Sequence, residues 1–432
     1  MKKVLALVLA GVLMVGIVGC TTKKETKEQE DNGDKVTAEE GTVVIWAWDQ
    51  NLPPIDLAVK KYEEANPDSN VTFDVQSVPD TVDKLSVFFS SGVKTDLPDL
   101  VLVDNLQIQS FLQQYPGKIT NISAMGYDKH KQNFSAAHWD ILSTDGSLYA
   151  FPFDIAPVMM QVNLDVVEAA GVDPDSLNTW NDVIAAAPAI KNAGYHVTSA
   201  FAEGSLIGMM QSAGIGIYDK EGHIDLLNPI AVEVIEKFME MTQAGVQDPL
   251  VSGDAYNTGE LAISLDPAWL IGEKMPIVPE LSGKIKLYPI PAVADNYGQS
   301  YNDGGSSFIL LETSKLKEAA YAMAEILTTD LEVQDVALAQ GLMPGYIPAA
   351  ELESFQTGLD YYNGQPVWQM LAESASDTLP IYVNKDYQVG KDALKNMVID
   401  VINSGTNKSA IDILKEAATQ IEMQTGRKVN QY

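Results

Sequence analysis

Apolar, β-branched segments alternate with helix-like segments near the start of the chain, and this alternation limits the possible folds more than any other feature. Strands are predicted at residues 42–48, 71–75 and 99–103, which are rich in valine, isoleucine and aromatic residues. Helical spacing of apolar residues predicts helices between them, at 55–65 and 81–92. Strands joined through a helix lie parallel in one sheet. The sequence therefore predicts an α/β fold.

Later segments predict more helices and two further strands. Thr179 is expected to cap a helix that starts at Trp180, with Asp182 at the capping-box distance, so Trp180 is interpreted as structural. The strands are expected at 261–265 and 284–289. The other helices are predicted at residues 229–244, 316–329, 331–340, 386–403 and 409–426.

The N-terminus has the pattern of a bacterial lipoprotein signal peptide. Lys2 and Lys3 precede an apolar stretch at 4–18, and small residues precede Cys20, the only cysteine in the chain. The apolar stretch is too short for a comfortable membrane span. Position and pattern together predict that residues 1–20 are a signal ending at a lipidated Cys20, which anchors the protein to the membrane.

The segment after the cysteine is strongly polar. Residues 21–41 hold many charges of both signs and few apolar side chains, so this segment cannot bury enough surface to offset its chain entropy. We interpret it as a flexible stalk. An exposed charged helix is the alternative, and it would equally space the folded part from the membrane.

Composition excludes several classes of function. With 432 residues the chain is long enough for two domains, and its net charge of −31 argues against a nucleic-acid partner. The 4 histidines show no metal-ligand spacing, and a cysteine zinc cluster is excluded because there is one cysteine. We therefore expect no metal site and no cofactor.

Polar and aromatic side chains follow several predicted strands. In an open α/β sheet the carboxyl ends of the strands face the ligand crevice. Carboxylates and amides pair with sugar hydroxyls, while an indole face covers the apolar face of a sugar ring. An acidic residue at such a place serves equally well as a helix cap or in a solvated loop, and Trp269 serves equally well in a core. The strand-end candidates are Trp48, Asp49, Gln50, Asp104, Asn105, Asp154 and Trp269.

A catalytic interpretation has less support. Asp104 and Asp154 have the chemistry of an acid–base pair at a glycosidic bond, but the sequence gives no separation between them. The sequence contains no serine-hydrolase, phosphate-loop or dinucleotide motif. We therefore expect a binding protein and not an enzyme.

Four stretches resemble the extracellular solute-binding lipoproteins of bacterial ABC sugar importers, the family related to maltose-binding protein. They are VVIWAWD at 43–49, PDLVLVDN at 98–105, GSLYAFPFDIAP at 146–157 and GELAISLDPAWL at 259–270. Their order and spacing extend over about residues 42–427. The resemblance implies a type II periplasmic-binding-protein fold, with two α/β lobes joined by a hinge of three crossings.

The resemblance also assigns site residues one position at a time. Trp269 matches an aromatic residue that stacks on sugar, and Glu203 matches an acidic position of the second lobe. Tyr387 lies near a position where maltose-binding protein has a tryptophan, and Gly305 belongs to a glycine-rich segment of the first lobe. Asp266 stands where the family more often has glycine, a departure that concerns the local loop shape.

The predicted protein is a receptor on the outer face of the cell membrane that binds a mono- or oligosaccharide and delivers it to ABC permease subunits. It is expected to act as a monomer, without a nucleic-acid partner. A polyamine, a peptide or a metal ion is the alternative solute, and a secreted polysaccharide hydrolase is the alternative class. The predicted first lobe comprises residues 42–154 and 292–345, and the second comprises 155–291 and 346–432.

Overall fold

The computed structural model describes residues 39–432 except 93–96, 252–254 and 405–406. The predicted signal, Cys20 and the stalk up to residue 38 lie outside the described residues. The expected first strand begins earlier than Thr42, because Glu40 and Gly41 already pair with the next strand. Just before it, the Glu39 carboxylate accepts hydrogen bonds from the first-turn N–H groups of Glu318 and Ala319. A carboxylate is favourable there because the N–H groups of a first helical turn have no partner within the helix.

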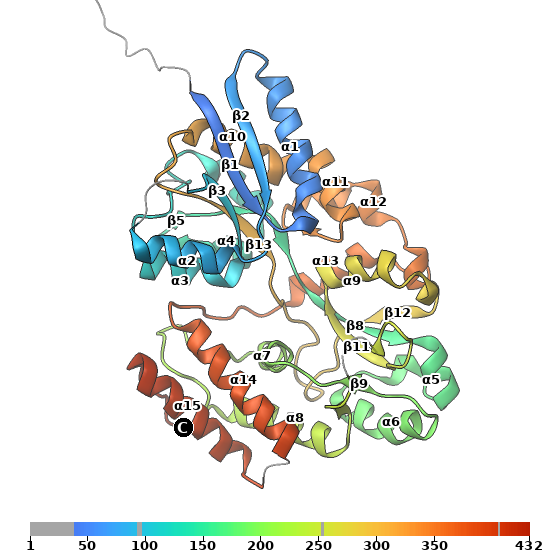
Figure 1. The fold of residues 1–432 in the computed structure, drawn as a ribbon. Helices are drawn as coiled ribbons and strands as arrows, with labels where there is room; N and C mark the ends of the chain where they lie inside the picture. Colours follow the sequence, from blue (N-terminus) through green and yellow to red (C-terminus); the bar gives the residue numbers. More distant parts are fainter. Residues whose placement is uncertain (1–38, 93–96, 252–254, 405–406) are drawn as a thin grey trace, which may run out of the picture. The chain divides into compact units, whose positions relative to one another are not determined.

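The first sheet has five strands in the order β2-β1-β3-β13-β6 (Figure 1). Strands β1 (Glu40–Ala47), β2 (Asn70–Ser77) and β3 (Leu100–Asp104) run parallel, as the sequence predicts, and are connected through α1 (Leu52–Ala65) and α2 (Thr81–Ser91). β13 (Ser306–Leu310) pairs antiparallel with β3, and β6 (Phe151–Pro152) pairs antiparallel with β13. We call the part of the chain around this sheet the first lobe. Its other main helices are α3 (Asn105–Gln114), α4 (Ala136–Ile141), α10 (Lys317–Thr329) and α11 (Leu331–Ala339).

A second sheet has three strands in the order β11-β8-β12, and we call the part around it the second lobe. The central strand β8 (Val158–Asn163) is buried along its whole length and pairs antiparallel with both neighbours, β11 (Ile263–Pro267) and β12 (Ile285–Tyr288). The strand expected at 261–265 corresponds to β11, which ends at Pro267 and thus later than predicted. Asp266, expected in a loop, lies within β11 opposite Met159.

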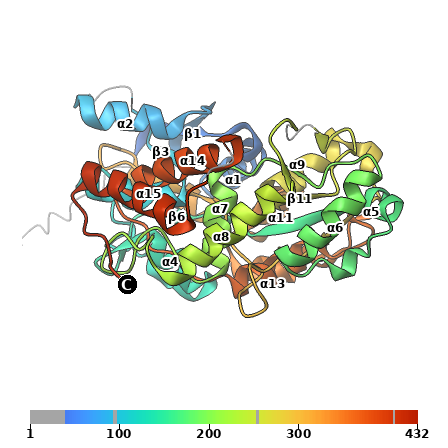
Figure 2. The same cartoon turned by 90° about the horizontal axis from the view of Figure 1, so that it is seen from below.

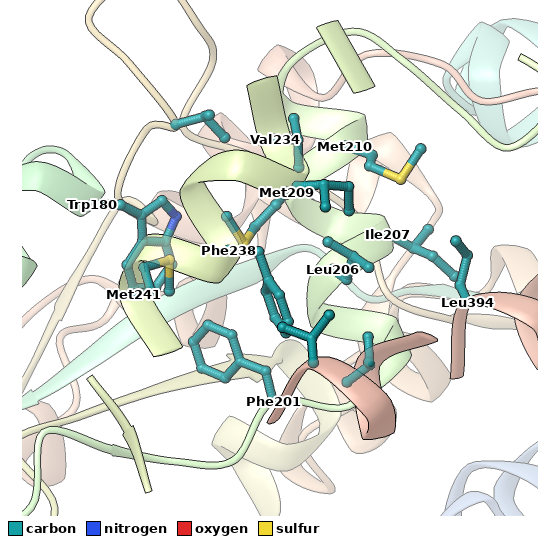
Figure 3. Packing of buried hydrophobic residues seen from close by; sticks show 14 of the residues in the cluster. Trp180, Phe201, Leu206, Ile207, Met209, Met210, Val234, Phe238, Met241 and Leu394 are labelled. Atoms are coloured by element: carbon teal, nitrogen blue, oxygen red, sulfur yellow. The ribbon is translucent and has the colours of Figure 1, made fainter. Parts of the chain in front are cut away.

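Helices of the second lobe pack around one large apolar core. α14 (Tyr387–Ser404) and α15 (Ala410–Thr425) lie beside α7 (Glu203–Ser212) and α8 (Pro229–Gln243) (Figures 1 and 2). Figure 3 shows side chains of α7 and α8 meeting inside this core, among them Leu206, Met209, Phe238 and Met241. α5 (Leu164–Ala170) and α6 (Trp180–Asn192) contribute to the same core. The buried apolar residues of α9 (Ala268–Ile277), α12 (Glu353–Gln356) and α13 (Val367–Asp377) belong to a separate apolar cluster.

The chain passes between the two lobes in three segments that lie side by side. β7 (Asp154–Ile155) pairs antiparallel with β14 (Met343–Pro344), and Pro157 forms an antiparallel bridge with Asn302. Ala156 N–H also donates to the Asn302 side-chain oxygen at 2.9 Å. The first crossing therefore contacts both of the others, as expected of a three-crossing hinge. The residue boundaries predicted for the two lobes stay a prediction.

The start of α6 confirms the expected capping box. Thr179 Oγ1 accepts from Asp182 N–H at 3.3 Å, and the Asp182 carboxylate accepts from Thr179 N–H at 2.8 Å. Trp180 is fully buried, and its ring meets that of Phe201 edge-on at 5.5 Å. Its structural role, predicted from the sequence, is thus confirmed.

Trp180→Ala is expected to lower the free energy of unfolding by about 3–5 kcal/mol, because it removes a large buried side chain and leaves a cavity. Urea unfolding followed by circular dichroism measures the change. Trp269→Ala is the matched control, since Trp269 is 37% exposed, and about 1 kcal/mol or less is expected there. Equal losses in both variants would contradict the structural role of Trp180.

Candidate functional site

The loop between β1 and α1 brings three predicted residues to one edge of the first sheet. Trp48 follows β1 directly, and Asp49 and Gln50 belong to the short 3-10 helix η1 (Asp49–Asn51). The Asp49 carboxylate accepts from the Ser77 hydroxyl at the end of β2. Gln50 Nε2 donates to the backbone oxygen of Gln340 at 2.6 Å. These bonds hold the loop against β2 and against the end of α11.

Asn51, next in the same loop, was not among the predicted site residues. Its side chain is 1% exposed, and neither its amide nitrogen nor its oxygen has a hydrogen-bond partner among the described residues. Each buried polar group left in this state costs about 1–3 kcal/mol. In the sequence, only its position directly after Gln50 indicates that Asn51 belongs to the site.

Asp104 both caps a helix and faces the site. It ends β3, and its Oδ1 accepts from Leu106 N–H at 2.7 Å at the start of α3. Asp104 therefore has the helix-capping role that was the alternative interpretation of the sequence. The cap uses only Oδ1 of the carboxylate. A methyl group added to Gly304 would lie 3.8 Å from Asp104 Oδ2, so this second oxygen is turned toward the Gly304 segment.

Asp154 lies at the first crossing and is 4% exposed. Its Oδ1 accepts from the backbone N–H of Ser306 at 2.5 Å and from the Ser306 hydroxyl. Gly305 fits beside it only because it has no side chain: its φ is +84°, and an added methyl group would lie 2.6 Å from the Asp154 backbone oxygen. The first and second crossings approach each other so closely here that position 305 has no room for a side chain.

Trp269 approaches the same place from the second lobe. It lies in the first turn of α9, directly after β11, and its side chain is partly exposed. Its indole nitrogen would lie 4.0 Å from a methyl group on Gly304. Gly304 therefore separates a first-lobe carboxylate, that of Asp104, from a second-lobe indole. The partly exposed ring is available to a ligand.

These residues line one cavity of about 1010 Å³ between the two lobes, which we call the main cavity. Gly304, which forms the glycine-rich segment with Gly305, lines it too. Asn51, Asp303, Glu273 and Gln340 also line it, although the sequence did not single them out as site residues. Among the described lining residues, every charged one is acidic. The predicted residues found here are Trp48, Asp49, Gln50, Asp104, Asp154, Trp269 and Gly305.

Burial raises the pKa of several of these carboxyl groups. The pKa of Asp104 rises to about 6, chiefly through burial, although the Leu106 N–H and Lys391 lower it. The pKa of Asp154 rises to about 7, again through burial, with Asp104 adding to the rise and Ser306 opposing it. Burial also raises the pKa of Asp303, and Glu203 contributes in the same direction. The charged forms of these acids are therefore disfavoured in the cavity.

The other three predicted residues lie outside the lining of the main cavity. Asn105 is 4% exposed; its Oδ1 accepts from the Ser307 hydroxyl at 2.6 Å, and its Nδ2 donates to the Asp154 backbone oxygen at 3.3 Å. Glu203 begins α7, close enough to Asp303 to affect its pKa. Tyr387 begins α14, is 3% exposed and packs in the second-lobe core. The roles of all ten residues in binding stay predictions.

The described part of the chain contains no group of three or more histidine, cysteine, aspartate or glutamate side chains arranged to hold a metal ion. It also contains no helix with the length and apolar composition needed to cross a membrane. What the main cavity offers is hydrogen-bond acceptors and donors beside indole rings. This arrangement suits a polar, hydroxyl-rich ligand that also has an apolar face.

The family model for the bacterial extracellular solute-binding proteins matches residues 49–331. This chain belongs to that family. The match includes the loop after β1, the first two crossings and α9, and therefore most of the residues that line the main cavity. The resemblance seen in the sequence is confirmed.

Two curated relatives have names that refer to sugars. The lactose-binding protein of Rhizobium radiobacter is 28% identical over 352 residues, covering 77% of this chain and 82% of the relative. The arabinooligosaccharide-binding protein of Bacillus subtilis (strain 168) is 24% identical over 441 residues, covering 95% of this chain and 98% of the relative.

Solved structures show the same fold. The GacH receptor of Streptomyces glaucescens, solved unliganded and with acarbose, aligns with a TM-score of 0.75 at 14% identity, covering 90% of this chain and 100% of the receptor. The galacto-N-biose-/lacto-N-biose I-binding protein of Bifidobacterium longum aligns with a TM-score of 0.72 at 17% identity, covering 90% and 99%. The predicted type II periplasmic-binding-protein fold is thereby confirmed.

Asp154→Asn is expected to change how stability depends on pH. An unfolded aspartate has a pKa near 3.9, whereas that of folded Asp154 is about 7, so between these values the folded state holds a proton that the unfolded state has lost. The contribution of Asp154 to the unfolding free energy should therefore fall as pH rises from about 4 to about 7, by up to about 1.4 kcal/mol per pH unit.

Asparagine does not titrate, and its oxygen still accepts from Ser306. The stability of Asp154→Asn relative to the wild type should thus increase with pH across this window. Urea unfolding at pH 4.5, 5.5, 6.5 and 7.5 measures it, with exposed Asp68→Asn as the control for loss of a negative charge. A difference between Asp154→Asn and the wild type that stays constant with pH would contradict the raised pKa.

Proposed function

We propose that this protein is a carbohydrate receptor that binds its ligand in the main cavity and delivers it to an ABC import permease. The observation that carries the proposal is that Trp48 of the first lobe and Trp269 of the second line one cavity together with carboxylate and amide groups. Indole rings suit the apolar face of a sugar, and the polar groups suit its hydroxyls. The sugar-binding names of the relatives support the same ligand class.

The cavity supports a binding mechanism that depends on both lobes. A ligand on the first lobe contacts Trp48 and Asp104, and closure adds Trp269 from the second lobe. Only the closed form makes both sets of contacts, so the ligand stabilises closure in proportion to the contacts that the second lobe adds. Asn51, buried with no side-chain hydrogen bond to the described part of the chain, is placed to gain one from the ligand or from a water molecule held with it.

The acidic lining favours one alternative ligand, a polyamine. Five lining residues are acidic: Asp49, Asp104, Asp154, Glu273 and Asp303. A cation would be attracted to this lining. The raised pKa values of Asp104 and Asp154 favour the neutral sugar over the polyamine, because burial disfavours the charged forms that attract a cation, whereas a carboxyl group in either form makes hydrogen bonds with hydroxyls.

Trp269→Ala is expected to weaken sugar binding by about 10-fold to 100-fold, equivalent to about 1.4–2.8 kcal/mol, because it removes the stacking surface of one lobe. Isothermal titration calorimetry of the wild type and the variant with lactose, linear arabino-oligosaccharides and spermidine measures this loss. Exposed Tyr432→Ala, far along the chain from the cavity, is the control and should keep the wild-type affinity.

Three outcomes would contradict the proposal. Binding of spermidine with no response to any oligosaccharide would favour the polyamine. Release of reducing sugar from an oligosaccharide by the pure protein would show a hydrolase. Equal affinity of the wild type and Trp269→Ala for a bound sugar would place the ligand elsewhere.

We further propose that the receptor acts as a monomer held outside the cell by lipid on Cys20. A tether keeps it within reach of the permease and raises its effective concentration there. Cys20→Ala is therefore expected to move the protein from the membrane fraction to the soluble fraction while sugar affinity stays within about twofold of the wild type. Fractionation with an anti-receptor blot and calorimetry measure the two properties. Retention of the variant in the membrane would contradict the lipid anchor.

A further inference from the structure

A second cavity, of about 440 Å³, lies against a different face of α9 from the main cavity, and we call it the side cavity. Trp269, Gly272 and Pro276 of α9 line the main cavity, while Leu270 and Lys274 line the side cavity. Such spacing places the two sets on different faces of one helix. Glu273, which is exposed, lines both cavities, so they adjoin along this residue.

The floor of the side cavity is a buried ion pair. Lys274 Nζ donates to Asp266 Oδ2 at 2.5 Å, and these residues are 9% and 4% exposed. Gln161 Nε2 and Ser264 Oγ donate to the same oxygen, each at 2.5 Å. Every hydrogen bond that the Asp266 carboxylate receives from the described residues thus ends on Oδ2. Oδ1 is left as an acceptor beside the cavity.

The pair is held in place by Tyr256, which also lines the side cavity. Lys274 Nζ lies 3.5 Å from the centre of the Tyr256 ring, and the Tyr256 hydroxyl donates to Gln161 Oε1 at 2.7 Å. A fixed pair presents an acceptor and a donor with no net charge, which suits an uncharged, hydroxyl-bearing group better than an ion. Ser199, Ser205 and Asn257 add polar groups, and Phe201 adds an apolar wall.

We propose that the side cavity is a second sugar subsite, which takes one branch unit of an oligosaccharide whose main chain occupies the main cavity. This inference rests on the proposed function. Among the described lining residues Glu273 alone is common to the two cavities, so the branch leaves the main chain beside that residue. Asp266 Oδ1 accepts from a branch hydroxyl, and the Lys274 ammonium donates to a branch oxygen. The receptor therefore prefers a branched oligosaccharide to the linear form of the same chain.

Calorimetry with two matched ligand pairs tests this preference: arabinotriose with and without a single arabinosyl branch, and lactose with and without a single fucosyl branch. In at least one pair the branched ligand is expected to bind the wild type about tenfold more tightly. Ser199→Phe, which fills the side cavity, should abolish this advantage and leave the affinity for the linear ligand within about twofold. Ser199→Ala is the matched control and should keep most of the advantage.

The possible failures are distinguishable. If linear ligands bind but neither branched ligand binds more tightly to the wild type, the subsite is disproved and the proposed function stands. An equal loss for linear and branched ligands in Ser199→Phe would likewise disprove it. If no sugar binds the wild type, the proposed function fails as well. Thermal unfolding checks that Ser199→Phe is folded, and Ala200→Phe, at an exposed residue of the same cavity, is the second blocking variant.

Discussion

The buried carboxylate of Asp154 is the interaction on which the arrangement of the two lobes depends. It lies in the first crossing and accepts two hydrogen bonds from Ser306, which follows the second crossing. β7, to which Asp154 belongs, also pairs with β14 in the third crossing. Gly305 must lack a side chain for these segments to approach so closely. One carboxylate therefore joins the hinge to the floor of the main cavity, so the geometry of the cavity follows from that of the hinge.

A second close contact sets the distance between the lobes on the far side of the main cavity. A methyl group added to Gly272 in α9 would lie 2.1 Å from the Gly341 Cα, just after α11, so the two backbones touch there. Gln50 donates to the neighbouring Gln340 carbonyl and thereby connects the β1 loop to the same place. The cavity is thus bounded by backbone contacts, while the partly exposed Trp269 ring faces it. This division of roles suits a receptor that opens and closes around its ligand without chemical change.

The strand–helix alternation in the first hundred residues predicted the parallel part of the first sheet, because the hydrophobic pattern there is local and periodic. The same pattern gave no sign that β13, some two hundred residues later in the chain, completes that sheet antiparallel next to β3. Asp266 was expected in a loop, yet it lies within β11 because Lys274, Gln161 and Ser264 satisfy its charge. Asn51 and Asp303 were missed because a buried, unpartnered amide or a desolvated carboxyl group has no distinctive sequence pattern.

The sequence by itself determined the α/β class, the family resemblance and the kinds of chemical group available, since these follow from local periodicity, short motifs and composition. Tertiary structure alone decided which of those groups meet. It placed Trp48 and Trp269 on one cavity, although more than two hundred residues separate them, and it placed Asn105 in hydrogen bonds behind that cavity. It also raised the pKa values of Asp104 and Asp154. Desolvation depends on what the whole fold packs around a group, and no local segment of the chain specifies that packing.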